Sequence, residues 1–120
     1  MLDFIYYTKQ NQTITVAVSE DIYEKLAKAG LSKEVTYSEH KLIVEDEEYE
    51  VNVAELNFDN RKKLLWIIER ERQIELENLF KAMDENPTIK EIRENFGYAK
   101  ILTEMYRLFK DEENIYFSYE

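Results

Sequence analysis

The residues of this chain best suited to chemistry are carboxylates, and they are concentrated in one stretch. Nine of the 26 residues from Glu34 to Asp59 are Asp or Glu, and Lys41 is the single base among them. This acidic segment (Glu34–Asp59) therefore carries −8 of the chain's formal charge of −10. Its densest part is the run Glu45–Glu50. A local negative field of this kind repels nucleic acid and anionic membranes and steers basic proteins toward it.

Other residues that usually carry catalysis are scarce. His40 is the only histidine and there is no cysteine, so a two-histidine metal site and a cysteine zinc site are both excluded within one chain. Two glycines cannot build a phosphate-binding loop, and neither Gly-rich nucleotide motif occurs. We expect no catalytic residue, no metal and no cofactor, and hence no enzyme. An enzyme would need a pocket holding two or more carboxylates with raised pKa values.

Two further uses of the acidic segment stay open as minor alternatives. Glu45–Glu50 lacks the central glycine of a calcium loop, so it suits at most weak divalent-cation binding. His40 is interpreted as a solvated turn residue, with a pH sensor or a general base as the alternative.

The composition favours one folded domain spanning residues 1–120. The chain is 44% hydrophobic and 13% aromatic, with two glycines and one proline, which indicates long regular elements joined by short connections. No apolar run approaches the roughly 18 residues that a membrane span needs. The N-terminus lacks the basic start of a signal peptide, so we expect a cytoplasmic protein, in a cell or in an infected host.

The N-terminal part alternates in the manner of strands. Leu2–Thr8 and Thr13–Val18 are predicted to be strands joined by a polar turn. Ser19 is a predicted N-cap, and Gly30 ends a short helix. Within the acidic segment, short strands are predicted around Val35 and Tyr37, at Leu42–Val44 and at Tyr49–Val53. The last two are expected to form a hairpin with Glu45–Glu48 near its turn and with Glu50 and Asn52 facing water.

The C-terminal half has helical periodicity. One helix is predicted to start with a cap at Asp59 or Asn60 and to end near Asn86-Pro87. A second helix is predicted from Thr88, with Gly97 inside it. The expected core stripes of the two helices are these: Leu65, Ile68, Leu76, Leu79 and Met83, and then Ile89, Ile92, Phe96, Ala99, Leu102, Tyr106 and Phe109. The short connection predicts an antiparallel helical hairpin, and Asn114–Tyr119 is predicted to be a last strand that pairs with Leu2–Thr8.

The predicted fold class is therefore α+β. It consists of a mainly antiparallel sheet of about five or six short strands, one short helix and a long C-terminal helical hairpin. Two polar stretches lie within the helices. Glu69–Gln73 is interpreted as an exposed turn held by local ion pairs, with a polar contact patch or a buried Arg72 tied to an acid as the alternatives. Asn60–Lys63 is the only basic cluster, and we expect it to balance the acids rather than to bind nucleic acid.

For the acidic segment as a whole, one interpretation is a charged sheet edge that discourages aggregation. The favoured interpretation is a surface that binds a basic protein, because this concentration of charge exceeds what solubility requires. The predicted partner-binding residues are Glu45, Asp46, Glu47, Glu48, Tyr49, Glu50, Glu55 and Asp59.

Small acidic domains without cofactors act against basic proteins in two settings that this chain resembles in size and charge only. The leading prediction is an inhibitor of the immunity-protein type that neutralises a basic, nuclease-like toxin by covering it. The alternative is a phage-encoded inhibitor of a host nucleic-acid enzyme, of the anti-CRISPR or DNA-mimic type. A third alternative is an oligomerisation module that uses the helical hairpin, for which an exposed apolar stripe along Ile67, Ile74 or Ile101 would be diagnostic. In all three cases we expect no direct contact with nucleic acid or membrane.

Overall fold

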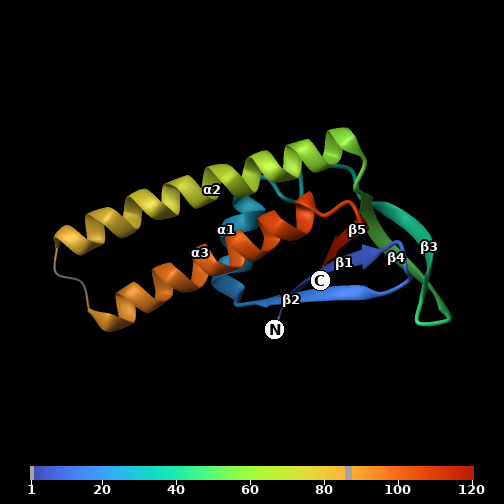
Figure 1. The fold of residues 1–120 in the computed structure, drawn as a ribbon, viewed down its shortest axis with the longest axis horizontal. Helices are drawn as coiled ribbons and strands as arrows, with labels where there is room; N and C mark the ends of the chain where they lie inside the picture. Colours follow the sequence, from blue (N-terminus) through green and yellow to red (C-terminus); the bar gives the residue numbers. More distant parts are fainter. Residues whose placement is uncertain (1, 86–87) are drawn as a thin grey trace.

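The computed structural model describes residues 2–85 and 88–120 and shows an α+β fold (Figure 1). The strands are β1 (Leu2–Thr8), β2 (Thr13–Val18), β3 (Ser38–Val44), β4 (Glu47–Glu55) and β5 (Asn114–Tyr119). The helices are α1 (Glu20–Ala29), α2 (Phe58–Asp84) and α3 (Ile89–Lys110). The strands form a five-stranded antiparallel sheet in the order β2-β1-β5-β4-β3. The predicted fold class is confirmed.

The first helix begins and ends at the residues that the sequence indicated. The Ser19 hydroxyl accepts a hydrogen bond from the Ile22 N–H at 3.3 Å. Gly30 caps the other end with φ +112°, a conformation that only glycine adopts readily. The predicted pairing of the last strand with the first is also confirmed, with Tyr6 opposite Phe117.

The core lies between one face of the sheet and the helices. Phe4, Tyr6 and Phe117 are fully buried there, and the Tyr6 and Phe109 rings meet edge-to-face with their centroids 5.0 Å apart. Leu102 of α3 belongs to the same buried cluster. Figure 1 shows that α2 and α3 run side by side and continue well past the sheet, so the molecule is 51 Å long. We call the part of the helical hairpin that has no sheet beneath it the arm; it consists of the C-terminal part of α2 and the N-terminal part of α3.

One predicted strand is absent, and the predicted starts of β3 and α2 were wrong. The segment around Val35 and Tyr37 is not a strand, although Val35 is buried, and β3 begins only at Ser38. The N-cap of α2 is Asn57, whose side chain accepts a hydrogen bond from the Asn60 N–H at 2.8 Å. Asp59 and Asn60 already lie inside the helix, because Asn57 captures the first free N–H group.

Helix α2 ends at Asp84, and the predicted end at Asn86-Pro87 lies outside the described residues. The Thr88 side chain caps α3 by accepting from the Glu91 N–H at 3.2 Å, and Gly97 lies inside that helix as predicted.

The predicted core stripes of the two long helices were partly wrong. Leu76 and Met83 are 49% and 61% exposed, and Ile89 and Phe96 are 71% and 55% exposed. Ile68, Leu79, Leu102 and Phe109 are buried as predicted. The helices also bury residues outside the predicted stripes: Leu64, Ile67, Glu75, Tyr98, Met105 and Leu108. The apolar arc of each helix is wider than the contact between the helices, so periodicity alone did not show which part of the arc is covered.

The polar stretch Glu69–Gln73 is exposed or half-buried. Within the described residues the only ion pair joins Arg72 to Glu69 at 3.1 Å, and the Arg72 guanidinium lies over the Tyr106 ring, 4.9 Å from its centroid. The local ion pair was predicted, but the turn is exposed only at Arg70 and Gln73, because Glu69, Glu71 and Arg72 are half-buried.

Candidate functional site: an acidic two-stranded ribbon

Strands β3 and β4 form a ribbon that is attached to the rest of the sheet at one end. They pair along their whole shared length, from Ser38 opposite Val53 to Val44 opposite Glu47. Only Ala54 and Glu55 of β4 pair with β5. The acidic tip of the ribbon therefore lies far from this attachment, at the end of the molecule opposite the helical arm (Figure 1).

The turn at the tip consists of two acidic residues in an unusual conformation. Glu45 and Asp46 have φ values of +51° and +68°, which place their backbone in the left-handed region. Residues other than Gly, Asn and Asp adopt this conformation at an energetic cost. This is the backbone of a tight hairpin turn whose twist matches that of the strands. The Glu45 N–H donates to the Asn11 carbonyl at 3.0 Å, which ties the tip to the turn between β1 and β2. The predicted turn position is confirmed.

One side of the ribbon covers the sheet face that lies opposite the helices. Residues opposite one another on paired strands share a face, so His40, Leu42 and Val44 lie on the same side as Val51 and Val53. The His40 ring lies against Tyr116 of β5, with the centroids 5.2 Å apart. His40 is thus a half-buried strand residue and not the solvated turn residue that was predicted. Its Nε2 is 3.1 Å from the Ser38 hydroxyl.

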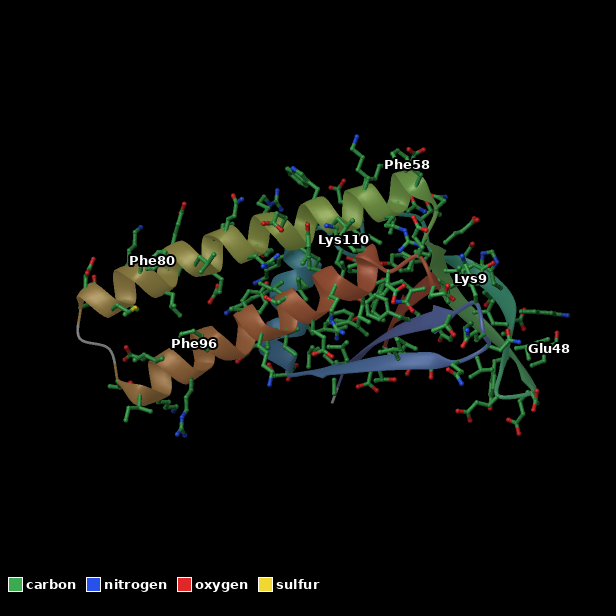
Figure 2. All side chains as sticks on the ribbon, in the orientation of Figure 1. Lys9, Glu48, Phe58, Phe80, Phe96 and Lys110 are labelled. Carbon is green, nitrogen blue, oxygen red and sulfur yellow. The ribbon has the colours of Figure 1, made fainter. Side chains whose placement is uncertain are left out.

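The other side of the ribbon faces solvent and carries three carboxylates and one lysine. Its residues are all exposed, and they are Glu39, Lys41, Ile43, Glu48, Glu50 and Asn52. Ile43, which is 53% exposed, lies opposite Glu48 and is the one large apolar side chain on this surface. We call this surface, with the turn residues Glu45 and Asp46, the acidic face; Figure 2 labels Glu48 at its end. Alternation along Leu42–Val44 could have identified Ile43 from sequence, since its neighbours on both sides face inward.

Tyr49 does not lie on the acidic face. It shares the inner side with Leu42, yet it is 46% exposed near the tip. Its hydroxyl donates a hydrogen bond to Glu47 Oε2 at 2.5 Å, and this bond to a carboxylate raises the pKa of Tyr49. Glu47 and Tyr49 therefore form the rim of the tip, next to the acidic face.

The remaining two predicted site residues are far from the tip. Glu55 is eight residues along β4 from Glu47, about 26 Å at the usual rise of a strand. Asp59 lies in the first turn of α2 beside a shallow hollow with Lys62, Lys63 and Trp66. The structure therefore brings six of the eight predicted residues together and separates Glu55 and Asp59 from them.

The basic cluster Asn60–Lys63 does not form ion pairs with these acids in the part of the chain that the structure describes. Arg61 instead donates to four backbone carbonyls, of Leu56, Phe109, Asp111 and Asn114, at 2.6–3.0 Å. Its role is to hold the start of α2 to the segment between α3 and β5. Among the described residues no ion pair involves a carboxylate of the ribbon, and Lys41, opposite Glu50, is the one base on its outer side.

Within residues 2–85 and 88–120, no group of three or more Asp, Glu or His side chains could hold a metal ion. In the same residues, no helix combines the length and the apolar character needed to cross a membrane.

No protein-family model matches the chain, and neither a curated protein nor a solved structure matches it. The chemistry that the ribbon itself offers is electrostatic recognition around an exposed apolar side chain.

Proposed function

We propose that this protein binds a basic protein through the acidic face of the β3–β4 ribbon and inhibits that protein by covering its functional surface. The observation that carries the proposal is the composition of this face. Exposed carboxylates without ion-pair partners in the described chain surround one exposed apolar side chain, Ile43. Interfaces that bind tightly commonly combine a central apolar anchor with a charged rim that steers association.

The ribbon is suited to this role because it is rigid where it meets the sheet and accessible where it is acidic. Its inner side packs on Tyr116 and its tip is tied to Asn11, so the backbone that carries the carboxylates is anchored at both ends. Binding then needs little ordering of the backbone, which lowers its entropic cost. Closely spaced carboxylates on a strand also present charge as a phosphate backbone does, and a nuclease or another nucleic-acid enzyme has a basic surface that fits such an array.

The form we favour is an immunity-type protein that neutralises a basic toxin. A phage-encoded inhibitor of a host nucleic-acid enzyme, of the anti-CRISPR or DNA-mimic type, would use the same surface and the same physics. The identity of the captured partner separates the two: a toxin supports the first and a host enzyme acting on nucleic acid supports the second. We place the interaction in the cytoplasm, where either partner would act.

The test is capture of a basic protein from source-cell lysate by the tagged chain, followed by an activity assay of the purified partner. In the test variant, Glu45, Asp46, Glu47, Glu48 and Glu50 are changed to Gln or Asn. A matched control removes five exposed carboxylates elsewhere: Glu24, Glu94, Glu112, Glu113 and Glu120. Both variants lose the same total charge, so any difference between them reports on where the charge lies.

We expect one basic protein to be captured and inhibited by the natural chain and by the control variant. Capture should be lost with the ribbon variant, and association should slow as salt is raised. An Ile43→Ser variant should keep fast association but dissociate sooner, because it removes the apolar anchor. Equal capture by the ribbon variant and the control would reject the proposal.

A further inference from the structure

The helical arm carries a second exposed surface, which is apolar. Where α2 and α3 contact each other, the buried positions include Glu75 and Leu79 on α2 and Tyr98 and Leu102 on α3. The residues that follow the two α2 positions, Leu76 and Phe80, are apolar and exposed. We call the apolar residues on this side of the arm the outer stripe: Leu76, Phe80, Met83, Ile89 and Phe96, which are exposed, and Ile92, which is half-buried. Its members are spaced by three or four residues on each helix, the spacing of a coiled-coil seam.

Both halves of the outer stripe lie on one face of the arm. Each residue is rotated about 100° from the one before it, and α2 and α3 run in opposite directions. A step of one residue past the contact therefore turns toward the same side on both helices. Figure 2 labels Phe80 and Phe96 on the adjoining outer halves of the two helices.

This face is turned away from the sheet. Ile67 and Leu108 come one residue before the contact positions Ile68 and Phe109, and both are buried. Ile101 occupies the same phase and packs against the core. Near the sheet, the side of the hairpin that precedes the contact thus covers the fold, and the side that follows the contact is free. Of the three residues named above as diagnostic of an apolar hairpin surface, Ile67 is buried and Ile101 is partly buried against the core. Ile74 is 44% exposed, but it precedes the contact position Glu75 and so lies on the opposite side of α2 from the outer stripe.

The outer stripe is large enough to form one half of a stable dimer interface. Leu76, Phe80, Met83, Ile89 and Phe96 are 49–71% exposed. At about 200 Å² for each fully exposed large side chain, they present about 600 Å² of apolar surface. Two copies facing each other would bury about 1,200 Å² in total, which reaches the range of specific interfaces. A patch of this size also exceeds what isolated surface residues explain.

The charges beside the stripe are arranged for self-association. Glu77 and Asp84 border it on α2, seven residues apart, and Arg93 and Lys100 border it on α3, also seven residues apart. All four are exposed, and none is ion-paired within the described chain. One edge of the arm is thus acidic and the other basic. In a two-fold pairing with its axis along the arm, α2 of one copy lies against α3 of the other, and the opposite charges meet.

We propose that two copies of this chain associate through the outer stripe into a four-helix bundle, with α2 of each copy packed antiparallel to α3 of its partner. Short-looped helical hairpins form such bundles when each presents an apolar face. The dimer leaves both acidic ribbons accessible, since they lie at the other end of each chain from the tip of the arm. The proposal of this dimer does not depend on the proposed binding of a basic protein.

The first test is the mass of the purified full chain in solution by sedimentation equilibrium, over a range of concentrations. We expect a dimer of the 14.5 kDa chain. A Phe80→Glu variant should be monomeric, whereas Ile43→Glu, which changes an exposed apolar residue on the acidic ribbon, should remain dimeric. A natural chain that stays monomeric at every concentration would overturn the proposal and assign the arm to a different partner.

A charge exchange then tests the pairing of the helices. One variant reverses the α2 edge (Glu77→Lys, Asp84→Lys) and another reverses the α3 edge (Arg93→Glu, Lys100→Glu). Alone, each should dimerise about tenfold more weakly or worse at low salt, because like charges meet twice. Mixed in equal amounts, the two should form a heterodimer with the affinity of the natural chain. Formation of this heterodimer would also show that both variants fold. If no heterodimer forms although circular dichroism shows both chains folded, the α2–α3 pairing is excluded.

Discussion

The guanidinium of Arg61 donates a hydrogen bond to the backbone carbonyl of Asn114 at 2.8 Å, which links the first turn of α2 to the start of β5. The Asn114 side chain in turn donates to the Leu108 carbonyl at 2.9 Å. The bond to Leu108, with those from Arg61 to the carbonyls of Phe109 and Asp111, satisfies carbonyl groups that the end of α3 leaves without helical partners. Arg61, which the sequence analysis assigned to a cluster that balances the acids, is therefore a structural clamp at the base of the helical hairpin.

Arg61→Met should destabilise the fold by about 2–4 kcal/mol, because several part-buried carbonyls lose a charged donor at once. Arg61→Lys should recover only part of this loss, since an ammonium group cannot reproduce the planar fork. The measurement is urea unfolding followed by circular dichroism. Lys62→Met, at an exposed neighbouring position, is the control and should change stability by less than about 0.5 kcal/mol. Similar effects at positions 61 and 62 would contradict the clamp.

The two glycines should respond in opposite directions to alanine. A Cβ at Gly97 would meet nothing within 4 Å, so Gly97→Ala should stabilise α3 by about 0.5–1 kcal/mol. At Gly30 the same change enforces a side chain at φ +112° and places its Cβ 2.9 Å from Glu34 Cγ. Gly30→Ala should therefore cost about 1–2 kcal/mol. Thermal unfolding of the two variants measures both, and changes of the same sign would show that one of these two environments is misassigned.

The turn of the acidic ribbon should become more stable with residues that favour its backbone. The double change Glu45→Asn and Asp46→Gly suits the left-handed conformation of both positions and should add about 1–2 kcal/mol. The matched control, Glu47→Asn with Glu48→Gly, removes the same charge from strand positions and should be destabilising. If both variants gained stability equally, relief of charge repulsion and not backbone conformation would be the cause.

The stability contributed by Glu75 should depend on pH. Burial raises the pKa of Glu75, outweighing the Lys25 charge and the Asn78 hydrogen bond that act to lower it. The native state then holds this proton more tightly than the unfolded state, so stability falls as pH rises from the ordinary glutamate pKa through the raised one.

Glu75→Gln removes that loss, and the variant should unfold at a higher temperature than the natural chain at about pH 7 but show little advantage near pH 4. Scanning calorimetry at both pH values measures the difference, with the exposed Glu24→Gln as control. An advantage that is equal at the two pH values would show that the ionisation of Glu75 is not its source.

Local sequence signals determined the kinds of element and many of their ends. Strand alternation, the Ser19 cap, Gly30 and the helical periods act within a few residues, and the structure follows them. The concentration of charge between Glu34 and Asp59 is likewise a property of the sequence alone. These features predicted the α+β class because each depends on short-range backbone preferences and burial patterns.

Tertiary structure alone decided which residues come together. The ribbon pairing places Glu55 away from the tip and Ile43 opposite Glu48, and both follow from the register and from the single attachment to β5. On the long helices, periodicity gave a broad apolar arc, but the neighbouring helix and the sheet cover only part of it. Leu76 and Phe96 are exposed because the arm extends beyond the sheet, and the length of an element relative to its support is a property of the assembled fold.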